Sequence, residues 1–99
     1  MVGFTDIPSQ KLEDLVTFTV LIPVKAVSQK NIGQEQFVRE VMQVTLLHIP
    51  DFVEEKIEIR ASSSGNYYAL TLMITFERIE QVHALDAALR AHPMVRMVL

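Results

Sequence analysis

The spacing of the hydrophobic residues changes several times along this chain, and the order of the changes limits the folds open to it. Some stretches have the two-residue period of a β-strand, and others have the 3.6-residue period of an α-helix. The strand-like stretches cover residues 18–27, 56–61, 67–76 and 95–99, and the helix-like stretches cover residues 34–48 and 79–90. The predicted order is therefore strand, helix, strand, strand, helix, strand.

This order predicts an α+β fold. Strand–helix–strand crossovers are right-handed, so both helices are expected on the same side of the sheet, and the two middle strands form a hairpin. We predict a ferredoxin-like βαββαβ arrangement, a four-stranded antiparallel sheet with two helices on one face. A chain of 99 residues has the length of one domain. We assign residues 18–99 to that domain and residues 1–17 to an N-terminal lead-in, which is either a short helix or flexible.

The alternation also assigns residues to the two faces of the sheet. In the third strand, Leu72 is expected to face the helices and Thr71 the opposite side. In the last strand, the same rule predicts that Val95, Met97 and Leu99 all point inward.

Composition excludes several classes of protein. The chain has no cysteine, which rules out disulfides and thiolate chemistry and fits a reducing compartment. No apolar run reaches the roughly 18 residues of a membrane helix, and residues 1–4 lack the basic start of a signal peptide. Nine basic and twelve acidic side chains give a net charge of −3, which disfavours a nucleic-acid partner. We expect a cytoplasmic protein without a membrane segment.

Catalytic and metal-binding patterns are weak. Glu80, His83 and Asp86 are spaced three residues apart on a predicted helix, but zinc sites need three or four ligands, commonly including thiolates. We interpret these side chains as a solvated helix face. No combination of nucleophile, base and orienting acid is legible, so we predict no catalytic residues, no metal, no cofactor and no enzymatic activity.

The loop between the two middle strands is the first candidate binding site. Its amides could converge on an anion, since Gly and Asn permit unusual backbone angles. Alternatively, it is only a tight turn in which Gly65 or Asn66 has a positive φ and the serines bond their own backbone. The candidate ligand-binding residues are Ser62, Ser63, Gly65, Asn66 and Tyr67.

The sheet face opposite the helices is the second candidate site, because it mixes charged and apolar side chains as protein interfaces do. Its candidate association residues are Lys25, Arg60, Tyr67, Thr71, Met73 and Arg96. We expect it to bind a protein partner or a second copy of the chain. The alternative is an RNA-recognition-type module, but such modules stack bases on two or three sheet aromatics, and only Tyr67 qualifies here.

Three segments together resemble the YbeD-like family of small bacterial proteins. They are the hairpin Ser62–Tyr67, the start of the second helix at Ile79–Val82, and His92-Pro93 followed by Val95–Leu99. One departure is Ser28, at a position where glycine commonly ends the first strand. The resemblance implies a ferredoxin-like fold akin to ACT regulatory domains, which bind small effectors and pair through their sheets. It also implies an association with lipoate attachment.

These observations favour a non-enzymatic regulatory or adaptor domain that acts by protein association, with a small-molecule effector as a further expectation. The resemblance adds the link to lipoate metabolism.

Overall fold

The structure, a computed structural model, describes residues 19–99, so the predicted lead-in lies outside the described residues. The strands are β1 (Val20–Ser28), β2 (Ile57–Ala61), β3 (Tyr68–Phe76) and β4 (Val95–Val98). The helices are α2 (Gln34–His48), the 3-10 turn η2 (Glu54–Lys56) and α3 (Ile79–Ala91). The predicted order of elements is confirmed. No helix in residues 19–99 is long and apolar enough to cross a membrane.

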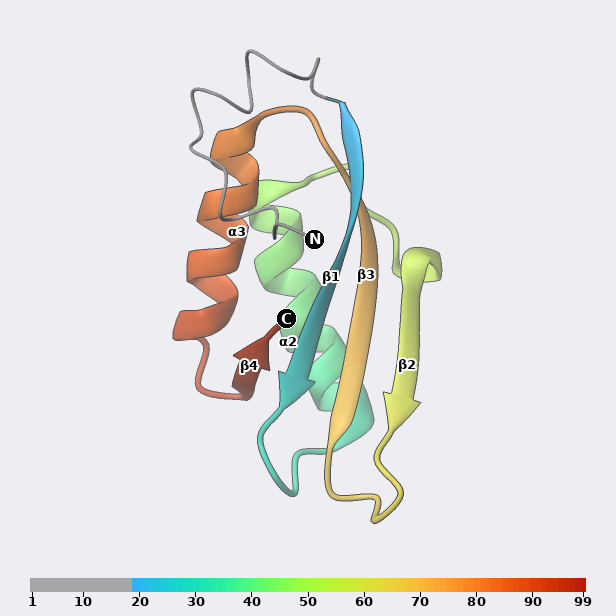
Figure 1. Cartoon of the computed structure of the whole chain (residues 1–99). Helices are drawn as coiled ribbons and strands as arrows, with labels where there is room; N and C mark the ends of the chain where they lie inside the picture. Colours follow the sequence, from blue (N-terminus) through green and yellow to red (C-terminus); the bar gives the residue numbers. More distant parts are fainter. Residues whose placement is uncertain (1–18) are drawn as a thin grey trace, which may run out of the picture.

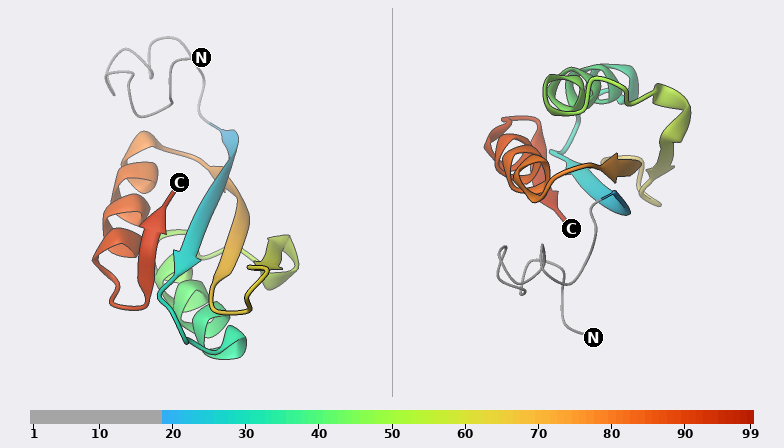
Figure 2. Two further views of the ribbon diagram at one scale, coloured as in Figure 1. Left: turned by 60° about the horizontal axis from the view of Figure 1, so that its bottom comes forward. Right: turned by 90° about the horizontal axis from the view of Figure 1, so that it is seen from above.

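The four strands form one antiparallel sheet in the order β2-β3-β1-β4. Seen from above, α2 and α3 lie on the same side of this sheet (Figure 2). The view in Figure 1 looks onto the other side, which we call the open face. The α+β ferredoxin-like βαββαβ arrangement is therefore confirmed.

The hydrophobic core lies between the sheet and the two helices, and β3 contributes most to it from the sheet. Leu70, Leu72, Ile74 and Phe76 are all fully buried, and they alternate with the half-buried or exposed residues of the open face. Burying one such side chain contributes about 1.5–3 kcal/mol. From the helices, residues spaced by one turn complete the core: Phe37, Val41 and Thr45 from α2, and Val82, Leu85 and Leu89 from α3.

The last strand differs from the prediction. The register shifts between Val27 and Ser28, because Ser28 pairs with Val95 while Val27 pairs with Met97. Arg96 is therefore the extra residue of a β-bulge, which interrupts the alternation. As a result Val98 is buried with 6% of its surface exposed, whereas Met97 and Leu99 are 41% and 70% exposed. The prediction was right for Val95 and wrong for Met97 and Leu99.

Ser28, the residue at the departure from the family pattern, has a defined structural role. It is fully buried, and its Oγ accepts a hydrogen bond of 2.9 Å from the backbone N–H of Tyr68. A glycine could not accept this bond. Ser28 thus ties the end of β1 to the start of β3, next to the loop that was proposed as a binding site.

Candidate functional site

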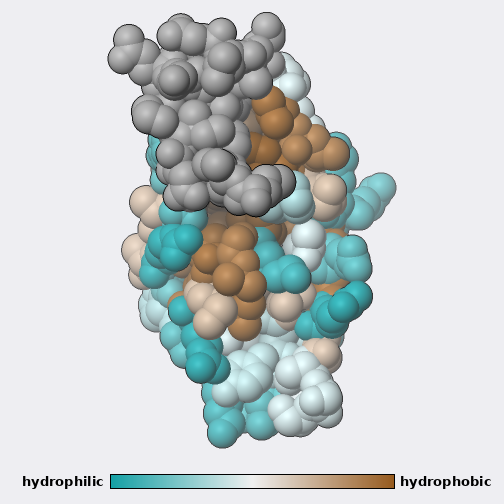
Figure 3. Space-filling view, viewed as in Figure 1, coloured by the Kyte–Doolittle hydropathy of each residue, from teal (hydrophilic) through white to brown (hydrophobic). Residues whose placement is uncertain are grey.

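The open face is built from rows of side chains that the strand register sets side by side. In one row, Arg60 of β2 lies beside Ala69 of β3, which lies beside Val27 of β1, and Met97 of β4 follows. Figure 3 looks onto the open face, as Figure 1 does, and shows hydrophobic and hydrophilic areas close together on the surface.

The next row along the open face carries Glu58, Thr71 and Lys25 on β2, β3 and β1. Among the described side chains of these two rows and Arg96 beside them, three are basic (Lys25, Arg60 and Arg96) and one, Glu58, is acidic. The whole chain, in contrast, carries a net charge of −3. This end of the face is therefore locally basic in an acidic protein.

A pocket of 310 Å³ opens at the end of the open face, and we call it the Tyr67 pocket. Its lining residues come from all four strands and the hairpin: Val27, Arg60, Ala61, Ser62, Tyr67, Tyr68, Ala69, Arg96 and Met97. The guanidinium carbon of Arg96 lies 5.1 Å from the centre of the Tyr67 ring, within the range of a cation–π interaction. Because Arg96 is the bulge residue, both it and Met97 reach this pocket.

The structure divides the predicted association residues. Arg60, Tyr67 and Arg96 meet in the Tyr67 pocket. Lys25 and Thr71 are paired in the adjacent row. Met73 instead lines a separate depression of 280 Å³ near η2, together with side chains that include Pro50, Asp51, Lys56 and Thr75.

The hairpin residues form a tight turn. Gly65 has a φ of 75°, as the turn interpretation requires, and its N–H donates to the Ser62 carbonyl at 2.9 Å. The Ser62 Oγ accepts from the Tyr67 N–H at 3.2 Å and lies 3.3 Å from the Ser64 Oγ. The N–H groups of Gly65 and Tyr67 are thus hydrogen-bonded within the loop, whereas an anion-binding loop would direct such groups at the anion.

Among the predicted ligand-binding residues, Ser62 and Tyr67 line the Tyr67 pocket, whereas Ser63, Gly65 and Asn66 do not. Binding at the tip of the hairpin stays a prediction.

Sequence reasoning missed part of the pocket floor. Met97 was assigned to the core, and only the bulge turns it to the open face. Alternation carries no signal for a bulge, because the extra residue is defined by the partner strand and not by the local sequence.

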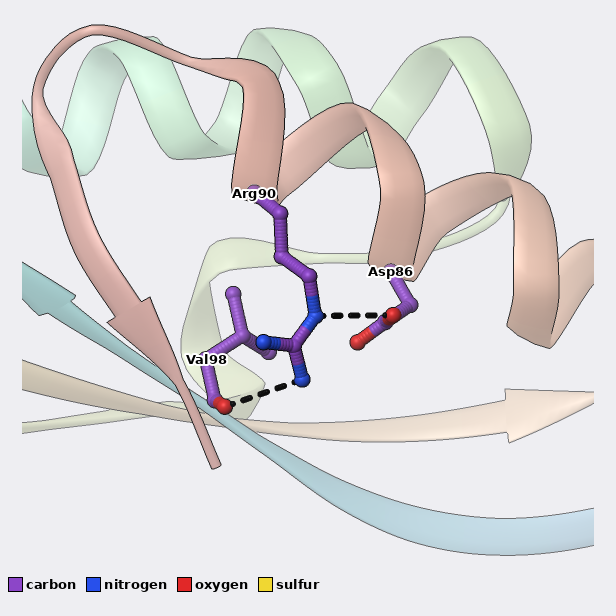
Figure 4. A network of polar contacts seen from close by, with 3 residues as sticks. All are labelled: Asp86, Arg90 and Val98. Carbon is purple, nitrogen blue, oxygen red and sulfur yellow. Dashed lines mark hydrogen bonds and ion pairs between the residues drawn. The ribbon is translucent and has the colours of Figure 1, made fainter. Parts of the chain in front are cut away.

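The predicted solvated face of α3 includes an ion pair between Asp86 and Arg90 (Figure 4). Asp86 Oδ2 lies 2.9 Å from Arg90 Nε. Within residues 19–99, no group of three or more His, Asp or Glu side chains is placed to hold a metal ion.

Comparison with known proteins identifies the family. A family model described as "Protein of unknown function (DUF493)" matches residues 13–99. The chain belongs to this family. The UPF0250 protein of Janthinobacterium sp. (strain Marseille) is 38% identical over 88% of this chain and 92% of its own. The UPF0250 protein of Chromobacterium violaceum is 33% identical over 92% of this chain and 99% of its own. These matches confirm the YbeD-like resemblance.

Proposed function

We propose that this domain is a non-enzymatic regulatory or adaptor module that binds a protein partner through the open face, with the Tyr67 pocket as the anchor point. The observation that carries the proposal is the composition of that pocket. Tyr67 and Arg96, which contact each other, line the pocket together with the apolar side chains of Val27, Ala69 and Met97. Tyrosine, arginine and methionine are enriched in protein interfaces, and the first two dominate their binding energy.

The charges around the pocket indicate the chemistry of the partner. Arg60 and Arg96 line the pocket, and Lys25 lies one row away. A partner segment with carboxylates flanking an apolar side chain would complement this surface. A small effector with an apolar body and one carboxylate has the same chemistry, and 310 Å³ is within the usual size of small-molecule sites. The link to lipoate, which has such a structure, rests on the family resemblance.

The lining of the pocket also supports a non-enzymatic function. Among the described residues that line the pocket, Ser62 is the only hydroxyl besides the two tyrosines, and none is a histidine or a carboxylate. Within residues 19–99 this lining places no general base beside Ser62, and the Ser62 Oγ is engaged in the turn.

A capture experiment with paired variants tests the proposal. Tyr67→Ala and Arg96→Glu should each abolish capture of the partner from native lysate, because they remove the anchor or reverse its charge. Arg39→Glu, an exposed change of the same charge on α2, should leave capture intact. Ser63→Ala should also be neutral. If Ser63→Ala alone removed binding from a folded protein, the hairpin would replace the pocket as the site.

Two further outcomes would contradict parts of the proposal. If single-stranded RNA were bound with a steep salt dependence and both pocket variants lost this binding, the RNA-recognition function would replace protein association. Absence of lipoate-attachment proteins from the captured set would contradict the link to lipoate. Unchanged capture by folded Tyr67→Ala and Arg96→Glu proteins would remove the Tyr67 pocket from the function.

A further inference from the structure

The open face carries a second pocket, which lies toward the other end of β3 from the Tyr67 pocket. It is the depression of 280 Å³ that Met73 and Thr75 of β3 help to line, and we call it the η2 pocket. The hairpin between β2 and β3 and the turn η2 lie toward opposite ends of the sheet (Figure 1). Along β3, Ala69 of the Tyr67 pocket and Thr75 of the η2 pocket are about 20 Å apart at roughly 3.3 Å per residue.

The two pockets carry opposite charges. Among the described residues, the charged side chains that line the Tyr67 pocket are those of Arg60 and Arg96. The η2 pocket is lined by two carboxylates, Asp51 and Glu77, and by one ammonium group, that of Lys56. Within residues 19–99, neither Asp51 nor Glu77 takes part in an ion pair. The open face is therefore basic at the hairpin end and acidic at the η2 end.

The η2 pocket has the composition that a basic side chain needs. Ile49 and Phe52 in its lining are buried, so they give it an apolar wall. The backbone N–H of Glu77 donates to Gln81 Oε1 at 2.8 Å, and Gln81 Nε2 donates to the carbonyl of His48 at 3.5 Å. These bonds join the start of α3 to the end of α2 and hold the pocket together. An apolar wall with carboxylates beside it matches the hydrocarbon stem and charged head of a lysine or arginine.

Apolar side chains continue along the open face between the two pockets. Pro23 of β1 lies beside Met73 of β3, and Leu21 lies beside Thr75. Leu21 is 56% exposed. Apolar side chains exposed between charged groups are typical of a surface that binds another protein.

We propose that the partner of the open face is an amphipathic helix that spans both pockets, with carboxylates in the Tyr67 pocket and a lysine or arginine in the η2 pocket. This inference rests on the proposed function of the open face. A helix suits a sheet face better than an extended chain does, because a helix satisfies its own backbone hydrogen bonds. At roughly 1.5 Å of rise per residue, the acidic and basic side chains of the partner are about 13 residues apart.

A second copy of this chain would match the charges of the open face but not its shape. Turned end to end, it would bring each basic end over an acidic end. Each of these ends is a depression, of 310 and 280 Å³. Two depressions that face each other leave a void, and side chains that line a void lose their packing contacts. A separate helix can project one side chain into each pocket.

Designed peptides that bind the full chain test the spacing of the two pockets. The first is a labelled helical peptide of about 18 residues, with glutamates in its first turn, a leucine stripe, and arginines about 13 residues further on. The control peptide has the same composition, but its arginines lie only about seven residues from the glutamates. Fluorescence anisotropy should show binding about tenfold tighter for the first peptide. Equal affinities, or no binding by either peptide up to the millimolar range, would overturn the inference.

Charge reversal tests the contact at the η2 pocket. Glu77→Arg should weaken binding of the first peptide about tenfold, because it places like charges together. A third peptide with glutamates at both ends should bind the Glu77→Arg protein as tightly as the first peptide binds the unaltered protein. Glu80→Arg makes the same charge change at an exposed position of α3 and should have no effect. Failure of the third peptide to restore binding, or an equal loss with Glu80→Arg, would refute this contact. Urea midpoints of each variant monitor folding separately.

Capture from native lysate separates this inference from the proposed function. If Tyr67→Ala abolished capture and Glu77→Arg left it unchanged, the Tyr67 pocket would keep its function and the second contact would be refuted. Sedimentation equilibrium of the unaltered protein gives the remaining outcome. A dimer that Glu77→Arg converts to a monomer would make a second copy the occupant of the open face and would overturn the inference.

Discussion

The bulge in β4 yields the sharpest test of this structure, because it reverses the faces that alternation assigns to the last residues. Val98 is 6% exposed and Leu99 is 70% exposed. Val98→Ala removes two buried methyl groups at about 0.8 kcal/mol each and leaves a small cavity, so it should cost about 2 kcal/mol. Leu99→Ala removes more carbon, but most of it already contacts water, and the cost should stay below about 1 kcal/mol.

Urea denaturation of the unaltered protein and the two variants measures these costs. Small proteins have urea m-values of about 1–3 kcal/mol/M, so Val98→Ala should lower the midpoint by about 0.7–2 M. Leu99→Ala should shift it by a fraction of that amount. Met97→Ala serves as a second control, because Met97 also faces the open side.

The opposite ranking would refute the bulge. If Met97→Ala and Leu99→Ala were costly while Val98→Ala was neutral, the strand would alternate without interruption, as the sequence pattern suggests. Met97 would then point into the core and could not line the Tyr67 pocket. The same titration therefore also checks the geometry of the Tyr67 pocket.

Three further predictions concern positions elsewhere in the sheet and its hairpin. Leu72→Asp should prevent stable folding, because it places an unpaired charge in the fully buried core. Thr71→Asp changes the open face and should still give the circular dichroism spectrum of the folded protein. Equal loss of structure in both variants would contradict the face assignment. Gly65→Val should cost about 1 kcal/mol or more in thermal unfolding because φ is 75° there, and Gly65→Asn should cost less since asparagine tolerates this region. Ser28→Ala should destabilise by about 1–3 kcal/mol in urea, because the Tyr68 N–H loses its acceptor, and an unchanged midpoint would show that this bond contributes nothing.

The sheet was predictable from sequence wherever one period extends over a whole strand. In β3, the alternation from Tyr68 to Phe76 assigned every face as the structure has it. The tight turn at Gly65 was predictable as well, because its backbone angle is a local property of glycine. Family membership followed from short motifs whose order along the chain is itself sequence information.

The sequence did not predict how the start of α3 is capped, although the capping residue, Gln81, lies within the predicted helix. The side-chain oxygen of Gln81 accepts the backbone N–H groups of Glu77 and Arg78, at 2.8 and 3.1 Å. The usual start signal is a small polar residue before the helix. Here a side chain from inside the helix folds back instead, so the preceding residues look unfavourable.

The sequence by itself determined the type and order of the elements, the faces of β1 and β3, and the turn between β2 and β3, because each depends on residues close together in the chain. Only the tertiary structure decided what meets across the sheet. The bulge at Arg96 lies where the β1–β4 register shifts between Val27 and Ser28, and it turns Met97 to the open face, where this side chain lines the Tyr67 pocket. The exposure of Ile59 likewise depends on how far α2 extends over β2. Such contacts join residues distant in sequence, whereas hydrophobic periodicity assigns a residue to a face of its own strand or helix and does not name the residue that it meets.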